Sequence, residues 1–238
     1  MHLDTIRTSR RVDFPRWGAF VDITWLGHAA VRIRTRRAAV VFDPTDKSTG
    51  IDMGRPTGDI AVLSRMQHPH HNFTKGIKGT PIVVDSPGEY EILGTHIEGI
   101  RAVWPSASVK EKDPTVDFEP TTLFICQAEE LRFAHLGGLA EPPTVNQAEA
   151  LSNIEILIMP VSLPSGLDAA DAANIARTID PKIVIPVGYR LDKNGDSKEL
   201  GIFLEALGGD PEAAVSRLSV NRRNIGDTRR ITLLESRG

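Results

Sequence analysis

Short apolar runs separated by turn residues follow one another along this 238-residue chain, and they restrict it to a fold rich in β-strands. Residues 21–26 and 30–33 predict two strands joined by a break at Gly27-His28. In the second run valine and isoleucine alternate with arginine, so one face is buried and the other exposed. Further apolar runs predict strands at 38–42, 60–63, 82–84, 96–100, 122–126, 131–135, 154–159, 182–186 and 231–234.

Helical periodicity is concentrated in the second half of the chain. Residues 167–179 place apolar side chains three and four positions apart, and Pro181 ends the pattern. Shorter helices are predicted at 199–207 and 211–218. Strands first, followed by a strand–helix–strand alternation, predict an α/β (α+β) protein built as an αββα sandwich of two mixed β-sheets flanked by helices.

The two ends of this pattern define the expected domain organisation. Residues 1–20 are polar and aperiodic, and we interpret them as an N-terminal extension before a single domain at 21–238. Their arginines lack the apolar core of a secretory signal. No apolar run reaches the roughly 18–20 residues that a membrane-spanning helix needs. A cytoplasmic protein that does not contact a membrane is therefore expected.

Charge and cysteine content narrow the expected partners. A net charge of −3 gives no reason to expect a nucleic acid. Arginines at 32–37 and 222–230 could form a basic patch, but no aromatic residues are interleaved with them, so nucleic-acid binding is not expected. The single cysteine, Cys126, excludes an internal disulfide and a thiolate zinc cluster. Its apolar neighbours predict a buried thiol.

Residues 63–72, Leu-Ser-Arg-Met-Gln-His-Pro-His-His-Asn, carry the most distinctive chemistry of the chain. They place His68, His70 and His71 within four positions, directly after a predicted strand. Neutral imidazole nitrogens are common zinc ligands. The alternative interpretation is a set of loop histidines that hydrogen-bond to the backbone or to water without a metal.

Several segments follow one another in an order and spacing that resemble a known family. They read Ile-Thr-Trp-Leu-Gly-His-Ala at 23–29, Val-Phe-Asp-Pro at 41–44, Ser-Pro-Gly-Glu-Tyr-Glu-Ile at 86–92, Ala-His-Leu-Gly at 134–137 and Pro-Lys-Ile-Val-Ile-Pro at 181–186. The chain thereby resembles the metallo-β-lactamase superfamily, in particular its branch of small bacterial metal-dependent hydrolases similar to ascorbate-6-phosphate lactonase. The resemblance spans roughly residues 21–237 and implies the same αββα fold.

The resemblance also implies where metal ligands would lie. The family's first metal motif is His-x-His-x-Asp-His, and His68 and His71 match its second and last histidines. A bridging aspartate and two further histidines come from later loops. The positions that correspond to the remaining ligands hold Met66 (Arg65 in a shifted alignment), His70, Pro105, Gly138 and Gly188.

On this alignment neither metal site reaches the three ligands that a catalytic zinc needs. Two carboxylates that would offset the charge of a metal pair are also replaced. We therefore expect a protein that keeps the fold but has lost most dinuclear zinc ligands and its hydrolytic activity. It would act as a non-catalytic binding or assembly subunit, with a protein partner or a homo-oligomer, or with a small molecule as ligand, and no cofactor is expected.

The alternative is a mononuclear, histidine-based zinc hydrolase of a small phosphorylated or lactone-like substrate. His68, His70 and His71 would hold its metal, helped by His28 or His135, which the fold would bring to the same side. The pocket in which the family's metal ions would lie, called the old pocket below, is expected to be lined by His28, Asp43, Trp104, Gly138 and Gly188.

Overall fold

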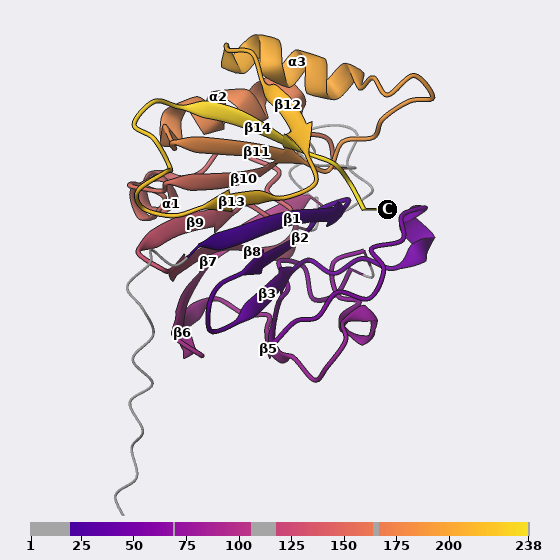
Figure 1. Cartoon of the computed structure of the whole chain (residues 1–238), viewed down its shortest axis with the longest axis vertical. Helices are drawn as coiled ribbons and strands as arrows, with labels where there is room; N and C mark the ends of the chain where they lie inside the picture. The colour runs from indigo at the N-terminus through magenta and orange to yellow at the C-terminus, as the bar shows by residue number, and fades with distance from the viewer. Residues whose placement is uncertain (1–19, 69, 106–117, 164–166, 238) are drawn as a thin grey trace, which may run out of the picture.

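The computed structural model describes residues 20–68, 70–105, 118–163 and 167–237, which form two β-sheets packed face to face (Figure 1). The predicted sandwich of two mixed sheets with helices is confirmed. The extension expected at 1–20 lies outside the described residues except for Phe20, as does most of the segment 105–120.

The first sheet has six strands in the order β13-β1-β2-β3-β4-β5. Its first three members in sequence form an antiparallel meander, because short turns join them and each pairs with the next. They are β1 (Val21–Gly27), β2 (Ala30–Arg34) and β3 (Ala39–Phe42). The parallel strands β4 (Ile60–Val62) and β5 (Ile82–Val84) extend the sheet beyond β3, and β13 (Leu218–Val220) pairs antiparallel with β1.

The second sheet has eight strands in the order β12-β14-β11-β10-β9-β8-β7-β6. Its antiparallel part is made of β6 (Gly88–Ile92), β7 (Thr95–Pro105), β8 (Phe118–Ala128) and β9 (Leu131–His135). Its parallel part continues from β9 through β10 (Ile156–Pro160), β11 (Ile183–Val187), β14 (Arg230–Leu234) and β12 (Glu212–Val215).

Three α-helices among the described residues lie on the outer side of the eight-stranded sheet, where Figure 1 shows α2 near β11 and β14, and α3 next to α2 at the end of the sheet formed by β12. They are α1 (Val145–Ala150), α2 (Ala169–Ile179) and α3 (Lys198–Leu207). The helices predicted at 167–179 and 199–207 are confirmed to within two residues. Asp168 caps α2 by accepting a hydrogen bond from the backbone N–H of Asp171 at 2.8 Å.

The outer side of the six-stranded sheet is covered differently. Met53 and Ile77 pack on it from the chain between β3 and β5, which contains the 3-10 helices η1 (Lys47–Thr49) and η2 (Thr74–Gly76). Between the sheets, fully buried side chains such as Phe42, Phe124 and Phe133 form the main core. Burial of this apolar area is the main stabilising term for the sandwich.

The helix predicted at 211–218 is wrong. Residues 212–215 form β12, which pairs in parallel with β14 through Glu212–Thr232 and Val215–Leu234, and β13 begins at Leu218. The alanine-rich run favours a helix locally, but pairing with the edge of the sheet overrides this weak preference.

Strand ends from both sheets meet at one edge of the sandwich. β3 and β4 are parallel and end just before Asp43 and Leu63, while β9 ends at His135. The ring of His135 reaches across to the carbonyl oxygen of Ala29 in the turn after β1, at 2.9 Å. This edge therefore brings together residues that are far apart in the sequence.

Candidate functional site

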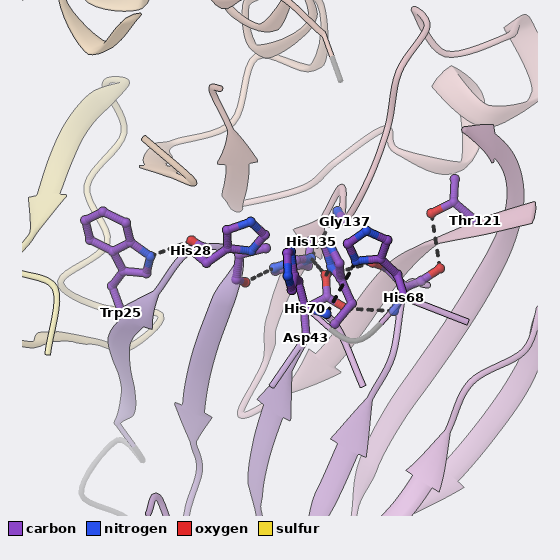
Figure 2. Close-up of polar contacts among 11 residues, drawn as sticks. Trp25, His28, Asp43, His68, His70, Thr121, His135 and Gly137 are labelled. Atoms are coloured by element: carbon purple, nitrogen blue, oxygen red, sulfur yellow. Dashed lines mark hydrogen bonds and ion pairs between the residues drawn. The ribbon is translucent and has the colours of Figure 1, made fainter. Parts of the chain in front are cut away.

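Asp43 is the central carboxylate of the edge where the strands end (Figure 2). It is 1% exposed and has a left-handed backbone with φ of 42°, which aspartate tolerates better than most residues. Its Oδ1 accepts a hydrogen bond from the backbone N–H of Ser64, and its Oδ2 accepts one from the Ser64 hydroxyl, both at 2.7 Å. The carboxylate thus ties the end of β3 to the loop that follows β4.

The ionisation of Asp43 is decided by opposing effects. Burial raises the pKa of Asp43. The neighbouring imidazoles of His71 and His135, together with the hydrogen bonds that the carboxylate accepts, lower the pKa by more than burial raises it, so it lies below its ordinary value. The nearest imidazole atom is Nδ1 of His71, 3.1 Å from Oδ2 of Asp43. We conclude that the carboxylate is charged in the folded protein.

His135 is held by backbone groups at both ring nitrogens. Its Nδ1 accepts a hydrogen bond from the backbone N–H of Gly137 at 3.0 Å, so its Nε2 carries the proton and donates to the carbonyl oxygen of Ala29. The ring stacks on Phe42 with centroids 5.1 Å apart. Burial lowers the pKa of His135, which keeps the imidazole neutral. Neither nitrogen is left to bind a metal in this arrangement.

His28 follows β1 in a turn with unusual backbone geometry. Its φ is 50°, and the preceding Gly27 has a φ of 108°. The indole N–H of Trp25 donates to the carbonyl oxygen of His28 at 2.8 Å and fixes this turn. Burial, together with the charges of His71 and His70, lowers the pKa of His28 to about 3. Its Nδ1 is buried and has no hydrogen-bond partner among the described residues.

Four imidazoles gather beside Asp43. The ring centroid of His28 lies 5.8 Å from the ring centroid of His70 and 5.3 Å from that of His71. The ring centroid of His68 lies 4.8 Å from that of His70 and 5.4 Å from that of His71. All four pairs meet edge to face. The predicted convergence of the loop histidines with His28 is therefore present. Nδ1 of His135 lies 3.8 Å from Oδ2 of Asp43, the same oxygen that Nδ1 of His71 approaches to 3.1 Å.

The loop that carries these histidines is anchored at both ends. The carbonyl oxygen of Ser64 accepts hydrogen bonds from the backbone N–H of Thr122 at 2.9 Å and from the hydroxyl of Thr121 at 3.1 Å. At the other end the backbone N–H of Phe73 donates to the carbonyl oxygen of Pro44 at 2.8 Å. Within the loop, the side-chain amide of Asn72 donates to the carbonyl oxygen of Met66 at 2.7 Å. The side chain of Met66 itself is 54% exposed.

The two glycines expected in the old pocket occupy different environments. Gly188 has a φ of +76°, and a Cβ atom on it would lie only 2.9 Å from Cδ2 of Leu163. The space beside its backbone is thus filled by an apolar side chain. Gly138 is buried in the turn after β9. On its neighbour Gly137, a Cβ atom would lie 2.4 Å from the Cβ atom of Ser64. Both turns are closely packed.

A metal centre requires several donor atoms that converge on one point. In the described part of the chain, no group of three or more histidine, cysteine, aspartate or glutamate side chains is arranged to hold a metal ion. The oxygens of Asp43 accept hydrogen bonds from Ser64, and the nitrogens of His135 are engaged by the backbone. These donor atoms of Asp43 and His135 are thus engaged by other groups of the protein.

Two sequence-based expectations concern side chains that cannot be placed. Trp104 and Pro105 end β7, but their side chains lie outside the described part of the structure. Ser64 was not predicted as a residue of the site, although it supplies two hydrogen bonds to Asp43. A serine at a strand end is a weak signal, because its partner lies 21 residues away in the sequence.

Comparison with known proteins shows which family the chain is similar to. The family model described as beta-lactamase superfamily domain matches residues 22–188. None of the curated protein sequences compared with the chain shows significant similarity.

Solved structures share the fold. A candidate zinc-dependent hydrolase of the metallo-beta-lactamase superfamily from Thermotoga maritima matches with a TM-score of 0.70 and 23% identity, over 91% of this chain and 100% of its own. A candidate metal-dependent hydrolase from Parabacteroides distasonis matches with a TM-score of 0.61 and 21% identity, over 92% of this chain and 96% of its own. The diiron β-hydroxylase CmlA from Streptomyces venezuelae has a TM-score of 0.58 and 11% identity, over 85% of this chain and 54% of its own.

A last observation concerns membranes. Among the described helices, none combines the length and the apolar character needed to cross a bilayer.

Proposed function

Because the chain belongs to the beta-lactamase superfamily domain family, we propose that it keeps the scaffold of that family's metal-dependent hydrolases without their dinuclear metal centre. Members of the family usually bind zinc or iron, and the similar structures include a candidate zinc-dependent hydrolase and a diiron hydroxylase. In this chain the scaffold would serve as a non-catalytic binding or assembly subunit.

The observation that carries the proposal is the packing at Gly188. On the alignment used here, this position corresponds to a histidine ligand in the family. A Cβ atom there would approach Cδ2 of Leu163 to 2.9 Å, so a histidine at this position would require the Leu163 side chain to move. The space that a ligand would need is filled by a leucine, which offers no donor atom.

Charge supports the same proposal. Two divalent ions carry four positive charges, and metal-binding carboxylates normally offset part of this charge. The aligned carboxylate positions hold His70 and Gly138. The one carboxylate that is buried among the described residues, that of Asp43, is already hydrogen-bonded to Ser64. A second metal ion would therefore meet four imidazoles without the negative charge that a metal pair requires.

Metal content of the untagged protein tests this proposal directly. We expect elemental mass spectrometry to find well below one equivalent of zinc or iron, both after dialysis and after added zinc has been dialysed away. The chain should also leave chromogenic phosphodiesters and lactones uncleaved with zinc present. Two tightly held equivalents of metal, or hydrolysis lost on chelation, would contradict the proposal.

A second candidate function rests on the orphaned atom of His28. Its buried Nδ1 has no hydrogen-bond partner among the described residues and belongs to the same cluster as His68, His70 and His71. No three of the described side chains are arranged to hold a metal ion, so these imidazoles would have to reorient to hold a single zinc ion. Such an ion would supply Lewis-acid chemistry for a small phosphorylated or lactone-like substrate, as the proposed lactonase-like branch implies. One equivalent of zinc, retained on dialysis and lost in both H70A and H71A variants, would favour this function over the first.

The proposed assembly role implies a protein partner or a second copy of the chain. Exposed apolar side chains on β5 and on the turn before β7 offer a surface for such a contact, namely Ile82, Val83 and Leu93. Light scattering coupled to size exclusion would measure the mass of the particle, and a monomer at every concentration would exclude the homo-oligomer. The cytoplasmic location expected from the sequence stays a prediction.

A further inference from the structure

A separate pocket lies beside the histidine cluster and contains none of its imidazoles. It has a volume of about 310 Å³ and is lined by four separate segments of the chain, which contribute Trp25, Ile51, Tyr189, Arg190 and Ser236 among others. In Figure 2 Trp25 lies beyond His28, on the side away from Asp43 and His68. The pocket is thus distinct from the edge where metal ligands would be sought, and its volume suits a small ligand.

Two aromatic rings form the floor of this pocket. Trp25 in β1 and Tyr189, two residues after the end of β11, pack with ring centroids 4.8 Å apart and planes tilted by 41°. They are only 2% and 5% exposed, so both are held firmly by the core between the sheets. The hydrogen bond from the Trp25 indole to His28 fixes the orientation of the tryptophan. The floor is therefore rigid and apolar.

One wall of the pocket depends on Gly27. A Cβ atom on this residue would lie 2.3 Å from Cγ2 of Ile51 and 3.2 Å from Oγ of Ser236. The absence of a side chain allows both segments to approach β1 closely. Because three of the four segments meet at Gly27 and Tyr189 packs on Trp25, the pocket exists without a ligand and needs little rearrangement to bind one.

The charge of the lining selects the ligand. Arg190 is the only charged side chain among the lining residues, and no aspartate or glutamate joins it. Within the described residues, its guanidinium makes no hydrogen bond or ion pair. The Tyr189 hydroxyl likewise has no partner in the described part of the chain, and burial raises its pKa to about 12, so it keeps its proton. Both groups are available donors.

We propose that this pocket binds a small aromatic carboxylate. The ring of the ligand lies against Trp25 and Tyr189, and its carboxylate accepts a forked pair of hydrogen bonds from Arg190. This inference goes beyond the proposed function, because it needs neither a metal ion nor the histidine cluster.

Calorimetric titration with three probes tests the proposal: benzoate, phenylacetate and indole-3-acetate. The titrations are run on the full chain in a buffer with a metal chelator, so that the result is independent of metal content. We expect at least one probe to bind, and its uncharged amide to bind about tenfold more weakly or worse, since a charge-assisted hydrogen bond is lost. Acetate and inorganic phosphate, which lack the ring, should also bind at least about tenfold more weakly.

Matched variants assign the binding to this pocket. R190Q should weaken the bound probe about tenfold or more, and R190K should weaken it less because it keeps the charge but loses the fork. R101Q, at an exposed position of β7 outside the pocket, should leave the affinity unchanged. The proposal is overturned by no binding of any probe at millimolar concentration, by equal binding of the amide, or by an affinity that R190Q does not change.

Discussion

Ser64 donates two hydrogen bonds to the carboxylate of Asp43, one from its backbone N–H and one from its hydroxyl, both 2.7 Å long. The same serine accepts hydrogen bonds at its carbonyl oxygen from Thr121 and Thr122 in β8. Asp43 follows a strand of one sheet, and the two threonines belong to the other. This pair of residues therefore joins the two sheets at the edge where the histidines gather.

Asp43 is expected to stabilise the fold independently of any activity. D43N removes the charge and places an amide opposite donors that need an acceptor, so we expect a loss of about 1–3 kcal/mol in the free energy of unfolding. Urea unfolding followed by circular dichroism measures this loss. D52N, at an exposed aspartate that pairs with Lys47 on the surface, is the matched control and should leave stability unchanged. Equal effects of the two variants would contradict a structural role for Asp43.

The lowered pKa of His28 should make the stability of the folded protein sensitive to acid. Its pKa is about 3 in the folded protein against an ordinary value of 6.5, so the unfolded chain binds the proton more readily. The folded state is therefore fully favoured above pH 6.5, and stability falls as the pH drops toward about 3, by up to about 1.4 kcal/mol for each pH unit. The lowered pKa of Asp43 adds a loss in the same direction below the ordinary value of 3.8 for aspartate.

H28N isolates this contribution, because asparagine tolerates the left-handed backbone at this position but does not titrate. Denaturant unfolding at several pH values should show a shallower decline for H28N than for the unaltered protein between about pH 4 and pH 6.5. The same slope in both proteins would assign the acid sensitivity to other groups.

The fold could be predicted from the sequence because its buried strands appear there as apolar runs or as alternating apolar and polar residues. Val31 and Ile33 face the core while Arg32 and Arg34 do not, and such alternation located β2 to within one residue. β7 and β8 are longer than expected, because their outer parts are held by pairing with each other, such as Trp104 with Glu119 in register. Pairing of this kind leaves no periodic signal in either segment.

The site could be predicted only in part. The loop histidines and His28 were expected on one side, and four of their ring pairs do meet. The role of each side chain of the site could not be predicted from the sequence, because it depends on contacts between the two sheets. The sequence alone does not indicate that backbone groups engage both nitrogens of His135, or that Leu163 lies against Gly188.

Cys126 is expected to be inert in the folded protein. Its thiol is fully buried in β8, and burial raises its pKa well above the ordinary value, so little thiolate forms. A disulfide reagent such as 5,5′-dithiobis(2-nitrobenzoate) should label the thiol only as fast as the protein unfolds. Labelling should become immediate in concentrated urea. Rapid labelling under native conditions would show that β8 opens locally.

Restoring the family's histidine at Gly188 should destabilise the protein rather than rebuild a metal site. Gly188 has a φ of +76°, and a Cβ atom would approach Leu163 to 2.9 Å, so even G188A should lose about 1–3 kcal/mol in the free energy of unfolding. Gly201 offers the matched control, since it lies within α3 and a Cβ atom on it would contact nothing within 4 Å. There an alanine should stabilise the helix by about 0.5–1 kcal/mol.

Denaturant unfolding of G188A, G188H and G201A measures these changes, and elemental analysis of G188H should still find no bound metal pair. A stable G188H that gains two equivalents of zinc would show that the chain lost its metal centre through this single position, because the rest of the scaffold would then have remained competent to bind it.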